Sequence, residues 1–169
     1  MTIRVAVLTV SDRSSRGERP DASGPALIKA CEENGWTVAN AATIPDDQNT
    51  ISARLIEWAD SERIDLVLTT GGTGFAPRDV TPEATLSVIH RLAPGLAEAM
   101  RSASLRITPH AMLSRAVAGI RNSTLIVNLP GSPKAALENL ATIAPVLPHA
   151  VELMQDSPAA EKGHAISQE

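Results

Sequence analysis

The chain has 169 residues, close to the usual size of one domain and enough to bury a substantial core. Hydrophobic residues make up 43% and charged residues 20%, a balance that gives no sign of wholesale disorder. The low aromatic content of 2% argues against a stacking platform for single-stranded nucleic acid, and the net charge of -4 argues against duplex binding. We therefore expect no nucleic-acid partner.

The single cysteine and the first residues bear on the compartment. Cys31 cannot form an intramolecular disulfide, and no Cys/His cluster has the spacing of a zinc site. The opening run "MTIRVAVLTVSD" lacks a basic leader and is far shorter than a membrane span. We expect a soluble, reduced, cytoplasmic protein without a membrane partner.

The first part of the chain alternates strands and helices. The β-branched run "IRVAVLTV" over 3–10 predicts a strand buried on both faces. A polar loop follows it, and a helix is predicted over about 25–34, with Gly35 as its C′ residue. A second strand, "WTVANAATI", covers 36–44 and ends in "PDDQN".

A second helix and a third strand come next. Apolar residues at helical spacing predict a helix from Asn49 or Thr50 to Ala59. The third strand, "IDLVLTT", leads directly into the glycine-rich loop "GGTGFAPRD". Thr81, followed by a proline and an acid, predicts the N-cap of a helix that reaches about His90.

The remainder of the chain continues this pattern. A helix begins near Pro94, and "MLSRAVAGIRNSTLIVNLP" predicts two strands around "RNS", a small β-hairpin. A helix with an apolar face over 136–144 follows, which Pro145 and Pro148 should break or kink. We predict one α/β domain over 1–155, with three layers and a mostly parallel sheet flanked by helices, and a poorly ordered polar tail over 156–169.

Polar or glycine-rich loops follow four of these strands. Ligands of open parallel sheets bind beyond the carboxyl ends of the strands. The polar strand ends are Ser11 with Asp12, Asp46 with Asp47, the loop over 71–79, and the segment over 128–133. Solvated turns and helix caps could explain any one of them, but a shared ligand site explains all four better.

The loop over 71–79 has the character of a phosphate site without a lysine. It lacks the pattern of a P-loop and the third glycine of a dinucleotide fingerprint, because Pro77 stands there. Gly71, Gly72 and Gly74 would let backbone N–H groups approach an anion, and the helix after Thr81 would add positive potential.

Asp79 in this loop would repel phosphate unless a divalent cation lay between them. Mg²⁺ prefers one or two carboxylates together with phosphate oxygens and water. Asp46 or Asp47 could supply the second carboxylate; the alternative for Asp79 is an exposed acid or a helix-terminal charge. His90, His110, His149 and His164 lie away from the strand-end loops, so we expect no histidine base or metal ligand.

Several separated motifs resemble one family. "TTGGTGFAPRDVTPEAT", "LTVSDRSSRGERPDASGP", "IPDDQ" and "SLRITPHAMLSRAVAGIRNSTLIVNLPGSPKA" are similar, in order and spacing, to the molybdopterin-binding domains of molybdenum-cofactor biosynthesis. Molybdopterin adenylyltransferases are the nearest relatives by this resemblance, which covers nearly the whole chain. It implies adenylylation of the terminal phosphate of molybdopterin by Mg²⁺ and ATP, a homotrimer, and transfer of the product to a downstream molybdate insertase.

The resemblance also implies roles for individual residues. Asp46 and Asp79 match the two catalytic aspartates of the family, for which we expect a role in holding Mg²⁺; we favour Asp46 over Asp47. The residues implied for the ligand site are Ser11, Asp21, Gly71, Gly72, Thr73, Gly74, Arg78, Ser104, Pro130 and Gly131. Two other interpretations stay open: a paralogue that binds molybdopterin without adenylylating it, and a trimeric scaffold.

Overall fold

The protein is described by a computed structural model that covers residues 2–61 and 63–156. Its centre is a six-stranded sheet of order β2-β1-β3-β6-β5-β4. The strands are β1 (Arg4–Val10), β2 (Thr37–Ile44), β3 (Leu66–Thr70), β4 (Arg91–Leu92), β5 (Ala118–Arg121) and β6 (Thr124–Leu129). The pairs β1–β2, β1–β3 and β3–β6 are parallel, whereas β5 pairs antiparallel with β6 and with β4. The predicted mostly parallel sheet with a β-hairpin in its distal half is confirmed.

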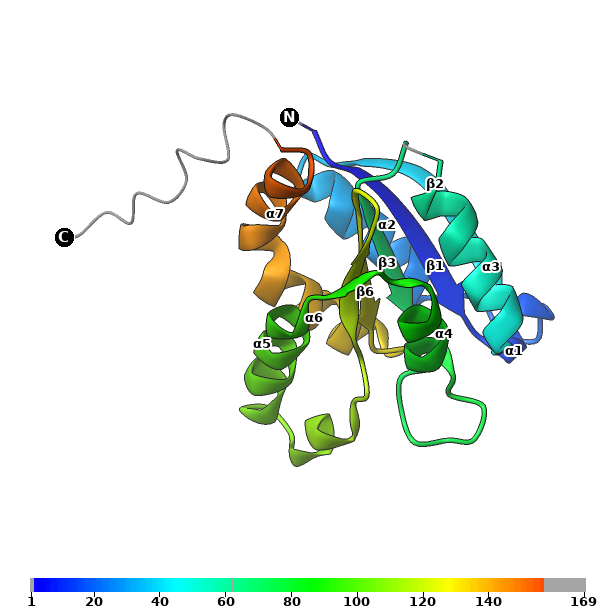
Figure 1. Ribbon diagram of the computed structural model, residues 1–169. Coiled ribbons are helices and arrows are strands. Elements are labelled where there is room, and N and C mark those ends of the chain that lie inside the picture. Colours follow the sequence, from blue (N-terminus) through cyan, green and yellow to red (C-terminus); the bar gives the residue numbers. More distant parts are fainter. Residues whose placement is uncertain (1, 62, 157–169) are drawn as a thin grey trace.

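Helices cover both faces of the sheet (Figure 1). The α-helices are α1 (Asp12–Ser15), α2 (Ser23–Glu33), α3 (Gln48–Ala59), α4 (Thr81–Val88), α5 (Pro94–Leu105), α6 (Pro133–Ile143) and α7 (Leu147–Met154), and the 3₁₀ helices are η1 (Pro109–Leu113) and η2 (Ala144–Val146). The side chains of α2, α5, α6 and α7 form one core against the sheet, and those of α3 and α4 form the other. The fold is therefore the expected three-layer α/β arrangement.

The sequence of β1 explains why this strand lies inside the sheet, between β2 and β3. Val5 and Val7 belong to the core under α2 and α6, whereas Ala6 and Leu8 belong to the core under α3 and α4. All four side chains are at most 1% exposed. A strand buried on both faces needs apolar residues at every position, and the first apolar run predicted this.

Some elements differ from those predicted. The polar segment after β1 contains α1, which has no buried residue and hence no apolar period to reveal it. Asp47, rather than Asn49 or Thr50, caps α3, and its carboxylate accepts a hydrogen bond from Thr50 N at 2.8 Å. The helix α4 ends at Val88 because Ile89 is extended, and the two-residue β4 follows it.

The segment before β5 also differs. We predicted a strand from about residue 112, but Pro109 starts η1, and the strand begins only at Ala118. The predicted break near Pro145 and Pro148 is confirmed, because η2 separates α6 from α7. Of the polar tail, only Asp156 is among the described residues; 157–169 lie outside them. No helix in the described ranges is long and apolar enough to span a bilayer.

Candidate active site

The carboxyl ends of the parallel strands surround a cavity of about 600 Å³, called here the larger cavity. In Figure 1 these ends point to the lower part of the molecule, opposite the N-terminus. Among the residues named from the sequence, those that line it are Ser11, Asp21, Asp46, Gly71, Gly72, Arg78, Asp79 and Gly131. Loops that follow β1, β2, β3 and β6 therefore meet at one site, as the polar strand ends predicted.

The other named residues line a second cavity of about 300 Å³, the smaller cavity. These residues are Thr73, Gly74, Ser104 and Pro130. Its walls are largely apolar and come from α5, η1, the segment between them and α6; they include Met100, Ile107 and Leu113. Since Gly72 lines one cavity and Thr73 the other, the glycine loop separates two compartments, which the sequence did not predict.

One histidine lies closer to the site than we expected. His110 lines the smaller cavity, because η1 folds its segment back over α5. His90 lies at the opposite end of the sheet, where its ring contacts Arg121 and Asn122. His149 is in α7, away from both cavities, and His164 lies outside the described residues. The expectation that all four lie away from the strand-end loops is wrong for His110.

The glycine loop has a backbone that other residues could not adopt. Gly71 has φ +102°, and a Cβ atom there would lie 2.2 Å from the carbonyl oxygen of Val10. Gly72 has φ +65°, and a Cβ atom there would lie 2.4 Å from Thr81 Oγ1 and 3.2 Å from Asp46 Oδ1. Absent side chains thus let the loop pack against β1 and bring Asp46 close to it. The N–H groups of Gly72, Thr73 and Gly74 have no acceptor within the described ranges.

Asp46 follows β2 and is held by the segment after β1. Its Oδ2 accepts a hydrogen bond from Asp12 N at 2.8 Å. Partial burial raises the pKa of the Asp46 carboxyl, the hydrogen bond from Asp12 lowers it, and the charges of Asp12 and Asp79 raise it further. A carboxylate that is partly buried beside other carboxylates is a site where a cation would be stabilised.

Asp79 lies at the end of the glycine loop. Its Oδ2 accepts a hydrogen bond from Ala76 N at 3.0 Å, and a Cβ atom on Gly74 would lie 2.8 Å from the same oxygen. Oδ1 of Asp79 and Oδ1 of Asp46 accept no hydrogen bond from any described residue. Each aspartate thus keeps one oxygen available at the larger cavity.

This donor set fits Mg²⁺ bound together with a phosphate ligand. No three His, Cys, Asp or Glu side chains of the described ranges are grouped to hold a metal by themselves. Two carboxylates are, however, what Mg²⁺ uses when phosphate oxygens and water complete its shell. Asp47 is not part of this set, because its carboxylate caps α3 and does not line the cavity.

The start of α4 differs from our prediction. Thr81 does not act as N-cap: it is buried, its Oγ1 donates to Gly71 O at 2.9 Å, and its N–H donates to Gly72 O at 3.1 Å. The first turn of α4 therefore holds the glycine loop and lines neither cavity. The N-termini of α2, at Ser23, and of α6, at Pro133, line the larger cavity, as does Ser11, the N-cap of α1.

Asp21 has a mainly local task. Its carboxylate accepts hydrogen bonds from Thr9 Oγ1 at 2.6 Å and from Gly24 N at 3.0 Å. These contacts fix the start of α2 against the end of β1. In the smaller cavity, Ser104 Oγ donates to Asn139 Oδ1 at 3.2 Å and joins α5 to α6.

Sequence reasoning missed two residues beside the site. Asp12 orients Asp46, and Arg115 contacts the glycine loop with its guanidinium and its backbone. The only available signal for Arg115 was a lone arginine inside the apolar run "SRAVAGI". Asp12 was noted only as part of a polar strand end.

Comparisons with known proteins agree with this geometry. The family of the probable molybdopterin binding domain matches residues 6–149. Molybdopterin adenylyltransferase of Helicobacter pylori (strain J99) is 44% identical over 155 residues, which cover 90% of this chain and 88% of that protein. Gephyrin of Dictyostelium discoideum is 45% identical over 166 residues, 91% of this chain but only 23% of gephyrin.

A solved structure extends the comparison to the fold. The molybdopterin biosynthesis enzyme MoaB of Thermus thermophilus superposes with a TM-score of 0.87 at 52% identity, covering 93% of this chain and 99% of that one. The described sheet and these matches agree. The chain therefore belongs to the family of molybdopterin-binding domains of molybdenum-cofactor biosynthesis.

Proposed function

We propose that this protein is a molybdopterin adenylyltransferase that transfers AMP from ATP to the terminal phosphate of molybdopterin and releases pyrophosphate. The observation that carries the proposal is the pair Asp46 and Asp79, each with one free carboxylate oxygen at a cavity bordered by a glycine loop. The names of similar proteins, such as the adenylyltransferase of Helicobacter pylori, support the same reaction.

Two compartments beside one loop suit a reaction between two phosphate-bearing substrates. The larger cavity has the charged and hydroxyl groups that a polyphosphate needs, including Arg78 and the N-termini of α2 and α6. The smaller, apolar cavity suits a flat ring system. The loop between them would hold the reacting phosphates, because its unpaired N–H groups can donate to anionic oxygens.

The transfer needs no general base. The second pKa of a phosphate monoester is about 6, so the attacking oxygen already carries negative charge near neutral pH. It attacks the α-phosphorus of ATP, the bond to the bridging oxygen of the β-phosphate breaks, and pyrophosphate leaves. Mg²⁺, when bound, would supply charge neutralisation for the phosphates, and Asp46 and Asp79 would hold it. The glycine-loop amides would orient the attacking phosphate in line.

Other parts of the proposal follow from the family resemblance. We infer that the product is adenylyl-molybdopterin, that a downstream molybdate insertase consumes it, and that the protein acts as a homotrimer in the cytoplasm. Size measurement in solution tests the trimer separately from the reaction.

The experiment that tests the function follows AMP transfer directly. Purified protein is incubated with molybdopterin, ATP labelled in its α-phosphate, and Mg²⁺, and the labelled pterin product and pyrophosphate are quantified. We expect transfer with Mg²⁺ and none after its removal by a chelator. Binding of molybdopterin without transfer would instead favour the paralogue that only binds it.

A further inference from the structure

Arg115 connects both ends of the loop that carries Asp79. Its Nε donates to Gly74 O at 2.7 Å and its Nη2 donates to Asp79 O at 2.6 Å. Its Nη1 pairs with Glu83, in the first turn of α4. One planar guanidinium thus joins the start of the 74–79 segment, its end and the following helix.

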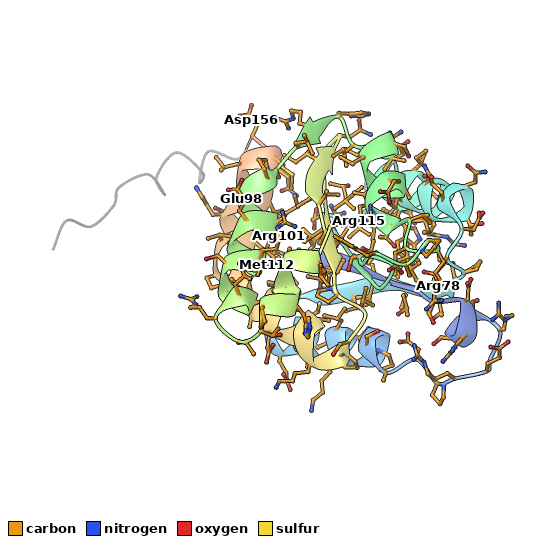
Figure 2. The ribbon with its side chains drawn as sticks, turned by 90° about the horizontal axis from the view of Figure 1, so that it is seen from below. Arg78, Glu98, Arg101, Met112, Arg115 and Asp156 are labelled. Atoms are coloured by element: carbon orange, nitrogen blue, oxygen red, sulfur yellow. The ribbon has the colours of Figure 1, made fainter. Side chains whose placement is uncertain are left out.

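The backbone of Arg115 is itself fixed on both sides. Its N–H donates to Thr73 O at 2.9 Å. Nη1 of Arg101, in α5, donates to the carbonyl oxygens of the two residues that flank it, Ser114 at 3.2 Å and Ala116 at 2.9 Å. Figure 2 shows Arg101 and Arg115 near the middle of the view and Arg78 nearer its right-hand rim. The backbone that carries the Arg115 guanidinium is therefore held in place.

Arg115 contacts the backbone of Asp79, and the Asp79 carboxylate is held by the same loop. Asp79 Oδ2 is held only by Ala76 N, an atom of the same loop, among the described residues. Asp79 N also donates to Ala76 O at 2.8 Å, so residues 76–79 form a closed turn, and Arg115 holds the two ends of the segment that contains this turn. Arg115 is not among the residues that line either cavity. Its effect on the site passes through the loop.

Only an arginine can make these contacts together. Its five N–H donors form a rigid fork that reaches two carbonyls and a carboxylate in one plane, whereas lysine offers one flexible ammonium. The Glu83 carboxylate compensates the positive charge of Arg115. Arg115 in turn holds the pKa of the Glu83 carboxyl below its usual value. The pair is half-exposed, with side chains 34% and 42% accessible, so it contributes little as a surface ion pair.

We propose that Arg115 is a positioning residue for the adenylyl transfer, which sets the orientation of Asp79 by bridging Gly74 O and Asp79 O. The expected effect on the rate of AMP transfer rests on the proposed function. The structural part of the inference concerns the loop in the protein without ligands, and can be measured whether or not AMP is transferred.

Arg115→Ala and Arg115→Lys test the proposal, with Arg121→Ala as the matched control. Arg121 also bridges a carboxylate and a carbonyl, because it pairs with Asp60 at 2.8 Å and donates to Val88 O at 2.9 Å, but it lies at the other end of the sheet. Two quantities are measured for each variant: hydrogen exchange of the Ala76 amide without ligands, and kcat and KM of AMP transfer. Melting temperature reports overall folding.

We expect exchange of the Ala76 amide to be about tenfold faster in both Arg115 variants, since this contact loses its support. We expect kcat to fall by about 100-fold in Arg115→Ala, the effect of misplacing a reacting group by about 1 Å, with KM for molybdopterin changed less than about threefold. Arg115→Lys should fold as the parent does and still lose about tenfold in kcat. Added guanidinium should restore part of the kcat of Arg115→Ala but not that of Arg115→Lys.

Arg121→Ala should lower the melting temperature without changing kcat or the Ala76 exchange rate. Unchanged Ala76 exchange in both Arg115 variants would overturn the proposal, as would a fall in kcat that Arg121→Ala reproduces at equal melting temperature. If the parent protein transfers no AMP, the proposed function fails, and the exchange rate alone then decides the structural part.

Discussion

Asp12 and Asp46 exchange two hydrogen bonds between the ends of neighbouring strands. Asp12 N donates to Asp46 Oδ2 at 2.8 Å, and Asp46 N donates to Asp12 Oδ1 at 3.0 Å. The reciprocal contact ties the segments after β1 and β2 together. It leaves Oδ1 of Asp46 at the larger cavity, where this oxygen could contact a metal ion that is bound together with phosphate.

The first prediction concerns this pair. Asp12→Ala removes the oxygen that accepts from Asp46 N but keeps Asp12 N, the donor to the Asp46 carboxylate. The backbone of Asp46 should therefore lose an anchor, and kcat of AMP transfer should fall by about ten- to 100-fold. Asp12→Asn keeps an oxygen that can accept this bond and should stay within about threefold of the parent. Steady-state kinetics at saturating ATP measures both. Equal losses in the two variants would show that the charge of Asp12, and not its hydrogen bond, matters.

The second prediction concerns the cost of keeping Asp46 charged. Its pKa is raised above the usual value of 3.8, chiefly by burial. A raised carboxyl pKa favours the folded state at low pH, and this contribution is lost as pH rises through the folded pKa. Asp46→Asn should therefore raise the melting temperature of the metal-free protein at neutral pH, by about 1–3 °C for a domain of this size.

The direction of the effect of the Asp46 charge on stability can be checked by changing the pH. The difference in melting temperature between Asp46→Asn and the parent should be largest at neutral pH and should shrink as the pH falls and the Asp46 carboxyl takes up a proton. Differential scanning calorimetry with a chelator present measures it. A difference that grows as pH falls would contradict the assigned direction.

Much of the fold could be predicted because apolar runs report burial. The strand β1 is apolar at successive positions and is buried on both faces. In contrast, α1 has no buried residue, and β4 consists of two exposed residues, so neither element leaves an apolar pattern. The start of β5 was predicted too early, because Pro109 and the cap at Thr108 form η1 where the apolar run suggested a strand.

Part of the site could also be predicted from the sequence. Polar residues at several strand ends placed Asp46 and Asp79 at one cavity, since parallel strands end at one edge. The role of Thr81 was misjudged because a Thr-Pro-Glu start is also typical of a helix N-cap. The contacts of Arg115 with Gly74 and Glu83 join residues 41 and 32 positions apart, and no local period reports such a pair.

The third prediction concerns Gly71. Gly71→Ala places a Cβ atom 2.2 Å from the backbone oxygen of Val10 and also requires φ +102°, so the glycine loop must move. We expect the free energy of unfolding to fall by about 2–4 kcal/mol. Gly17→Ala is the control, because Gly17 has φ +73° but open space around its Cα, and should cost only about 1 kcal/mol. Urea denaturation measures the free energy of unfolding of both variants. Equal losses would mean that the loop moves away from Val10 without a loss of stability.

The fourth prediction concerns Arg78, which is exposed and lines the larger cavity. If it contacts a substrate phosphate, Arg78→Ala should raise KM for ATP or molybdopterin by about ten- to 100-fold, the value of a charge-assisted hydrogen bond. The melting temperature should not change. Arg54→Ala removes a partly buried arginine that pairs with Glu57 on α3 and lies over the Trp58 ring, away from both cavities, and should leave KM unchanged. Unchanged KM for both substrates in Arg78→Ala would show that Arg78 does not contact either of them.

The most direct test of the metal-holding role compares Asp79→Asn with the parent protein in AMP transfer and in molybdopterin binding. Asparagine keeps an oxygen for Ala76 N but loses the charge that would hold Mg²⁺. We predict that Asp79→Asn abolishes transfer at any Mg²⁺ concentration while its dissociation constant for molybdopterin stays within about threefold of that of the parent. Loss of transfer and of molybdopterin binding to the same extent would contradict the metal-holding role of Asp79.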